Sequence, residues 1–180
     1  MNLMRTIRLD PSDTFVFDPP AEPGEWAVPG AFAFWDVDPG SLAGKRRTAF
    51  RSGFLGVESL GWSTLVQIVE ASAEDRANLV DRLARQLVAR FGAPDLQAAT
   101  AAAEEEVAFA ESLCAQPKDT LIAVHRAFED GAVREQFRTL RQREGAKPAR
   151  AFSFLEVEGE EDEQPDDRVD LIGMAEKDRK

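Results

Sequence analysis

The chain has 180 residues, 43% of them apolar and 31% charged, and its formal net charge is -11 at pH 7. This length predicts one domain with its own core, and the negative charge disfavours nucleic acid as a partner, because such a chain repels phosphates. One cysteine excludes an intrachain disulfide, and without a secretory leader or an apolar run of about 18 residues we expect a cytoplasmic protein that does not span a membrane.

The first 70 residues predict strands. Apolar residues alternate there with other residues, and proline and glycine turns separate the runs. Valine and isoleucine enrichment supports this most clearly at 64–70. The predicted strands lie at residues 3–9, 14–17, 25–38, 47–60 and 64–70.

The pattern then changes to a helical period. Leucines recur every four residues within 72–91, Ser72 begins a capping-box pattern, and Gly92 supplies a C-terminal cap. A second helix opens at Pro94, because proline is favoured at a first helical position, and ends before Pro117. Because about one turn joins them, the two helices predict an αα-hairpin.

Strands return at 120–128 and 133–140, and Asp130-Gly131 between them is typical of a tight hairpin. Residues 151–157 predict one more strand. Because strands, two helices and further strands follow in separate blocks, the sequence predicts an α+β fold. We expect a mostly antiparallel sheet with the αα-hairpin packed on one face.

The predicted domain ends at residue 157, and residues 158–180 form an acidic C-terminal tail. Residues 151–180 hold 11 acidic and 4 basic side chains, so they carry most of the excess charge. The acidic run 158–167 cannot bury apolar area and predicts a mobile tether. The apolar end that follows is typical of a docking element, with folding back onto the domain as the alternative. Its candidate residues are Val169, Leu171 and Ile172.

Few residue types for catalysis are present. His125 and Cys114 are the single histidine and cysteine, too few for a Cys/His zinc site, and we predict no metal or cofactor. His125 is interpreted as structural or exposed, with proton transfer as the alternative, and Cys114 as buried, with a nucleophile as the alternative. Residues 40–46 lack the spacing of a phosphate loop and are expected to lead into a strand. Glu104–Glu106 predict a solvated helix surface.

Basic and aromatic residues are the remaining binding candidates. The basic residues are either solvated charges and partners of the acidic tail, or a patch for an anionic ligand or acidic partner. The tryptophans belong either to the core or to an interface. The candidates are Lys45, Arg46, Arg47 and Arg51 around a turn, Arg134 and Arg138 on one face of a strand, and Trp26, Trp35 and Trp62 in the first block of strands.

The opening of the chain carries a resemblance. Residues 4–13 and 24–28 are similar to a family of short proteobacterial proteins of unknown function, and the similarity extends over 4–143. The family brings no catalytic residues. The resemblance implies an accessory role, because the genes of that family lie near accessory proteins for redox-enzyme maturation and a biotin/lipoate-ligase-like protein.

These observations favour a non-catalytic accessory or protein-interaction protein with a protein partner, bound in part through the tail. Exposed sheet edges leave a homodimer open. The alternative is a small-ligand binding protein or an unrecognised enzyme, with an arginine-fringed pocket near the tryptophans. Mimicry of nucleic acid is a weaker third hypothesis, because the acidity is concentrated in the tail.

Overall fold

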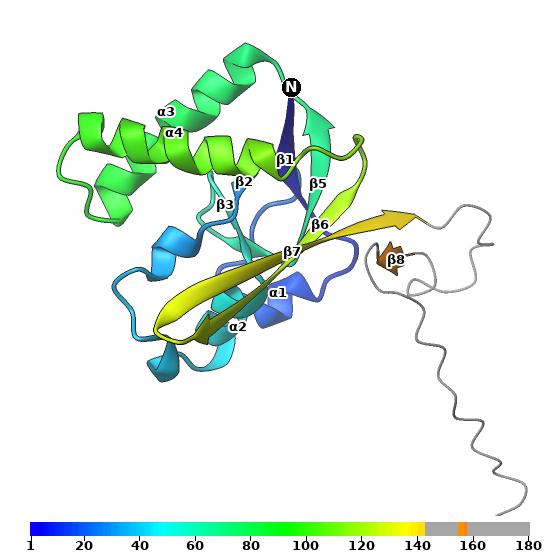
Figure 1. The fold of residues 1–180 in the computed structure, drawn as a ribbon, viewed down its shortest axis with the longest axis horizontal. Helices are drawn as coiled ribbons and strands as arrows, with labels where there is room; N and C mark the ends of the chain where they lie inside the picture. Colours follow the sequence, from blue (N-terminus) through cyan, green and yellow to red (C-terminus); the bar gives the residue numbers. More distant parts are fainter. Residues whose placement is uncertain (143–154, 158–180) are drawn as a thin grey trace, which may run out of the picture.

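The computed structural model describes residues 1–142 and 155–157. In Figure 1 the two long helices lie side by side above the strands, and the first residues enter the sheet beside them. The predicted α+β fold, an antiparallel sheet with an αα-hairpin, is confirmed. The elements are β1 (Asn2–Ile7), α1 (Asp13–Val16), β2 (Ala27–Val28), η1 (Ala31–Phe34), η2 (Pro39–Ser41), α2 (Gly44–Ser52), β3 (Phe54–Gly56), β4 (Trp62–Ser63), β5 (Leu65–Glu70), α3 (Ala73–Arg90), α4 (Leu96–Ser112), β6 (Leu121–Glu129), β7 (Ala132–Gln142) and β8 (Leu155–Val157), η1 and η2 being short 3₁₀ helices.

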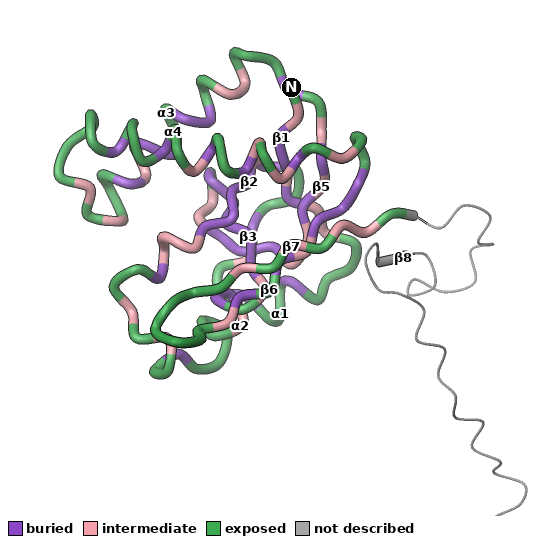
Figure 2. Tube along the Cα trace, viewed as in Figure 1, coloured by how far each residue is buried: buried purple, intermediate pink, exposed green. Residues whose placement is uncertain are grey.

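The main sheet has the strand order β1-β5-β6-β7-β8, and every neighbouring pair is antiparallel. Val66 of β5 stands opposite Ile122 of β6, and Val124 of β6 stands opposite Phe137 of β7. Alternate residues of a strand point to one face, so these side chains form one wall of the core. Figure 2 shows the buried segments gathered along the strands and on the inner sides of the helices.

A second, three-stranded antiparallel sheet has the order β2-β3-β4 and was not expected from the sequence. An isolated bridge between Arg5 and Trp26 joins its entrance to β1. The ring of Phe54 in β3 lies 6.2 Å from that of Phe137 in β7. The two sheets therefore share one core.

Helix α3 begins and ends as predicted. The Ser72 side chain accepts a hydrogen bond from the Asp75 backbone N–H, and the Asp75 carboxylate accepts one from the Ser72 N–H, which completes the capping box. Gly92 follows the helix with φ of 74°, a conformation that favours glycine. The local sequence signals thus fix both ends.

Helix α4 begins at Leu96, two residues later than predicted, because the Asp95 carboxylate caps it by accepting a hydrogen bond from Ala98 N–H at 2.8 Å. The helix packs against β1 and β2. Small side chains on its buried face allow a close approach to the strands. None of the helices in the described part of the chain is long and apolar enough to cross a membrane.

Three segments predicted as strands are helical. Residues 14–17 fall largely in α1, and Ala31–Phe34 form a 3₁₀ helix. The strand predicted at 47–60 is α2 in its first part and becomes β3 only at Phe54. Aromatic and β-branched residues are dense in the first two segments and are typical of strands, but tertiary contacts override this weak preference.

Helix α2 was missed because its apolar face is very short. Ala49 and Phe50 are its only buried residues, so no apolar stripe marks a helical period. The correction also affects residues 40–46, which lead into this helix rather than into a strand. The segment still lacks the spacing of a phosphate loop, and Arg46 stands where that loop needs serine or threonine.

The β6–β7 hairpin is confirmed. Asp130 and Gly131 have φ of 53° and 79°, as a two-residue type I′ turn requires. Strand β8 covers 155–157 of the strand predicted at 151–157. Residues 151–154 and the predicted tail, with Val169, Leu171 and Ile172, lie outside the described residues.

Candidate functional site

The first basic cluster lies on helix α2, where the sequence predicted a turn. Lys45, Arg46, Arg47 and Arg51 are all exposed. The helical period separates them, since consecutive residues point about 100° apart. Arg46 lines a pocket on one side of α2, whereas Arg47 and Arg51 line a groove on the other side.

The groove lies between α2 and β6 and has a volume of about 390 Å³. We call it the α2–β6 groove. Helix α2 packs directly on β6, and Pro39 and Gly40 of η2 also line the groove. The exposed side chains that give it its character are Arg47, Arg51, His125 and Phe128, and the buried residues Phe50 and Arg126 complete its lining.

The groove is cationic and partly apolar. Arg47 and Arg51 form no ion pair with any residue in the described part of the chain. His125 is exposed on β6, and Phe128 is 48% exposed at the rim. Guanidinium groups bind carboxylates and phosphates through paired hydrogen bonds. The groove is therefore suited to an anionic group that is joined to an apolar one.

Arg126 is the most deeply buried polar residue of the fold, with a side chain that is 0% exposed. Its Nε donates to Glu135 at 2.6 Å. Its Nη atoms donate to three backbone carbonyls, at 3.2 Å to Phe50, at 2.7 Å to Gly53, and to Pro29. Two of these carbonyls belong to the end of α2, where a helix leaves its last carbonyls unbonded.

Arg126 is a structural residue rather than part of a ligand-binding surface. Burial lowers the pKa of its guanidinium, although Glu135 opposes this change. Its role was not predicted from the sequence, although β6 contained a signal. Alternate positions of a strand share one face, and Ile122, Val124 and Arg126 occupy alternate positions of β6. The two apolar residues therefore indicate that the Arg126 side chain also points into the core.

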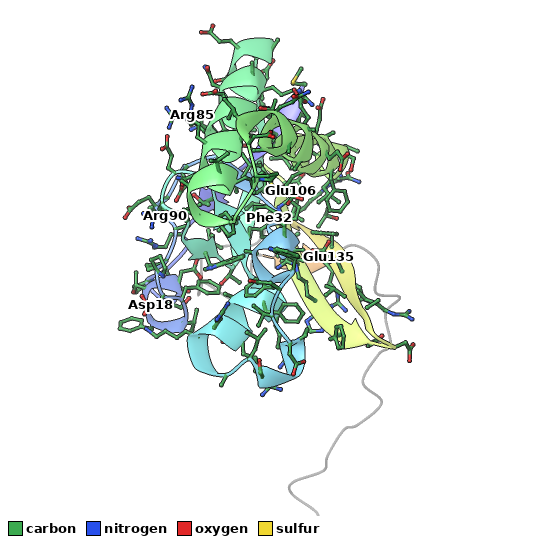
Figure 3. The ribbon with its side chains drawn as sticks, turned by 90° about the vertical axis from the view of Figure 1, so that its left-hand side faces the viewer. Asp18, Phe32, Arg85, Arg90, Glu106 and Glu135 are labelled. Carbon is green, nitrogen blue, oxygen red and sulfur yellow. The ribbon has the colours of Figure 1, made fainter. Side chains whose placement is uncertain are left out.

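Glu106 on α4 corrects the prediction of a solvated helix surface. Its neighbours Glu104 and Glu105 are exposed, but Glu106 is partly buried and accepts a hydrogen bond from Gly30 N–H at 2.9 Å. Burial raises the pKa of its carboxyl, and Glu135 adds to this, whereas the Gly30 hydrogen bond and Arg126 lower it. Figure 3 shows Glu106 and Glu135 in the same region of this side of the molecule as Phe32.

We expect the free energy of unfolding of the Glu106→Gln variant, relative to that of wild type, to increase as the pH rises from about 4 to 7. A carboxyl with a raised pKa in the folded state favours folding most below its unfolded pKa, near 4.5, and loses this advantage as the pH rises through the folded pKa. Glutamine retains the acceptor for Gly30 but does not titrate. Urea unfolding across this pH range tests the sign, and a difference that falls with pH contradicts it.

The three tryptophans lie in three different surroundings. Trp62 in β4 is 8% exposed, and its ring lies 5.1 Å from that of Phe34. Trp35 follows η1 and is 76% exposed. Trp26 lies beneath the Arg5 guanidinium, 3.7 Å from it, a cation–π contact. Trp26 and Trp62 line separate hollows of about 370 and 260 Å³, so the tryptophans do not form one site.

The second basic cluster is distant from α2 in the sequence and is locally paired. Arg134 and Arg138 share the exposed face of β7, as predicted. Arg134 forms ion pairs with Glu129 at 3.5 Å and with Asp130 at 3.2 Å. Arg134 is therefore already neutralised by the hairpin turn.

Cys114 and His125 do not form a catalytic pair. Cys114 is buried, and its thiol donates to the Ala110 carbonyl at 3.3 Å. Burial raises the pKa of the thiol to about 12, so it is protonated at neutral pH. The prediction of a buried Cys114 is confirmed. His125 instead lines the α2–β6 groove.

Comparison with known proteins places the chain in a family but gives it no activity. A model described as a family of unknown function, DUF6505, matches residues 1–154. No curated protein and no solved structure matches the chain. The family model covers most of the sequence, including every helix of the described residues and the strands up to β7. The chain therefore belongs to the DUF6505 family of unknown function.

Proposed function

We propose that this chain is a non-catalytic, cytoplasmic interaction protein that binds an acidic segment of a partner protein in the α2–β6 groove. The observation that carries the proposal is the pair Arg47 and Arg51, which are exposed and unpaired within the described residues. The chain as a whole carries a net charge of -11. In a protein so rich in carboxylates, two arginines that share a groove without a partner favour an external anion.

The spacing of the two arginines indicates the form of the partner. Residues four apart on a helix have Cβ atoms about 5–6 Å apart on one face. Side chains two apart on an extended strand are about 6.6 Å apart and also share a face. An extended segment with acidic residues at alternate positions therefore matches Arg47 and Arg51. Exposed Phe128 offers contact to an apolar residue of the same segment.

A short labelled peptide with glutamate at alternate positions and one leucine between them tests the proposal by fluorescence polarisation. We expect saturable binding to the full chain that weakens with added salt. The double substitution Arg47→Gln and Arg51→Gln is expected to reduce the affinity by at least about tenfold, because each charge-assisted hydrogen bond contributes roughly 1.5–3 kcal/mol.

The matched control is the double substitution Arg85→Gln and Arg90→Gln on α3, which removes the same charge from exposed positions outside the groove. We expect it to change the peptide affinity less than about twofold, in contrast to the tenfold loss at the groove. Equal losses in the two variants mean that only net charge matters, and they overturn the proposal. An absence of peptide binding to wild type overturns it as well.

A further inference from the structure

A second cavity lies on the other side of α2 from the α2–β6 groove. It has a volume of about 260 Å³, and we call it the Trp62 pocket. Its apolar walls come from three separate stretches of the chain: the end of η1, the β3–β4 segment and the end of α3. They are formed mainly by Phe34, Leu55, Leu60, Trp62 and Phe91.

Three residues in the walls of the Trp62 pocket are closely packed. Phe34, Leu55 and Trp62 belong to the buried core and are 6%, 1% and 8% exposed. Close neighbours leave the indole little freedom, since a Cβ added at Gly53 would lie 2.7 Å from it. A rigid apolar cavity of this kind binds without paying to order its own side chains.

Leu60 on the pocket wall is held in an unfavourable conformation. Its φ is 55°, in the left-handed region that leucine rarely adopts. Its N–H donates to the Gly56 carbonyl at 3.0 Å, which keeps the turn between β3 and β4 closed. Strained backbone of this kind is often found at ligand-binding sites. Leu60 therefore places a strained turn residue in the pocket wall.

Two opposite charges line the Trp62 pocket. Arg46 on α2 and Asp18 after α1 both line it, and both are exposed. They form no ion pair with each other or with any other residue in the described part of the chain. Figure 3 shows Asp18 at the surface of this side of the molecule, below Arg90 at the end of α3. The pocket thus presents a cation and an anion that do not neutralise one another.

We propose that the Trp62 pocket binds a free apolar L-amino acid. Its side chain occupies the hollow lined by Leu60, Trp62 and Phe91, its carboxylate pairs with Arg46, and its ammonium group pairs with Asp18. The volume is below the roughly 300–1,000 Å³ of sites for drug-sized ligands, which favours a molecule of this size. A simple carboxylic acid leaves Asp18 without a partner, and a simple amine leaves Arg46 without one. Only a zwitterion matches both charges.

Isothermal titration of the full chain with three related probes tests this inference. L-Phenylalanine carries both charges, 3-phenylpropanoate only the carboxylate, and 2-phenylethylamine only the ammonium. We expect L-phenylalanine to bind at least about tenfold more tightly than either analogue, because each analogue loses one charge-assisted pair. L-Serine, which lacks an apolar side chain, is expected to give no measurable binding.

Substitutions connect the binding to the pocket. Arg46→Gln and Asp18→Asn are each expected to weaken L-phenylalanine binding by at least about tenfold, the change of about 1.4 kcal/mol that loss of one charged partner produces. Arg47→Gln with Arg51→Gln is expected to leave it unchanged, which separates this inference from the proposed function of the α2–β6 groove. Thermal melts verify that the exposed-site variants fold. Absence of L-phenylalanine binding, equal binding of the three probes, or unchanged binding in both charge variants overturns the inference.

Discussion

The substitution Arg126→Met is expected to lower the free energy of unfolding by about 3–5 kcal/mol. The side chain is fully buried, and its guanidinium bonds Glu135 and three backbone carbonyls. Methionine fills a similar space but donates no hydrogen bond. The substitution therefore leaves these carbonyls and one largely buried carboxylate without a donor, and each such group costs about 1–3 kcal/mol before relaxation. Urea unfolding followed by circular dichroism measures the loss.

A matched control lies on the neighbouring strand. Arg134 is exposed and, among the described residues, pairs with Glu129 and Asp130 at the hairpin turn, so Arg134→Met is expected to change stability by less than about 0.5 kcal/mol. Arg126→Lys retains the charge but lacks the planar fork, so it cannot reach four acceptors and is expected to fall between the two. A loss below about 1 kcal/mol for Arg126→Met contradicts the structural role assigned here.

The helical hairpin could be predicted from the sequence because its signals are local. The capping box at Ser72, Gly92 in a left-handed conformation, and leucines at helical spacing all lie within one continuous segment. The hairpin turn at Asp130-Gly131 is equally local, since two residues specify the turn type. Such elements are fixed by hydrogen bonds between near neighbours in the chain.

Helix α2 and the second sheet were not predictable in the same way. Only Ala49 and Phe50 of α2 are buried, and β2 and β4 contain two residues each. Such short elements are stabilised by their neighbours rather than by their own residues. Arg126 illustrates this, because it bonds the end of α2 from a strand more than 70 residues away in the chain.

The residues of the candidate sites could be predicted from the sequence, but which of them lie together in the fold could not. The basic cluster was evident in the sequence, but its residues are divided between two hollows. This division follows from the helical period of α2, a segment that was predicted as a strand. The α2–β6 groove joins residues 47–51 to residues 125–128, and the Trp62 pocket joins Asp18 to Phe91. Contacts over such distances leave no mark in the local pattern.

Glu25→Ala is the second substitution with a large expected effect, a loss of about 3–4 kcal/mol in the free energy of unfolding. The Glu25 carboxylate is buried and holds the turn between β3 and β4 to the entrance of β2. Its oxygens accept from three backbone N–H groups, those of Glu22 at 2.7 Å, Glu58 at 2.8 Å and Ser59 at 2.9 Å. The Ser59 hydroxyl donates a fourth hydrogen bond at 2.5 Å.

Alanine at position 25 removes the acceptor of these donors from a closely packed site, in which a Cβ added at Gly56 would lie 2.4 Å from the carboxylate. Glu22→Ala is the control, since the Glu22 side chain is exposed and only its backbone enters the network; we expect a change within about 0.5 kcal/mol. Chemical unfolding of both variants decides the matter. If Glu25→Ala unfolds within about 1 kcal/mol of wild type, water replaces the carboxylate as the acceptor in this turn.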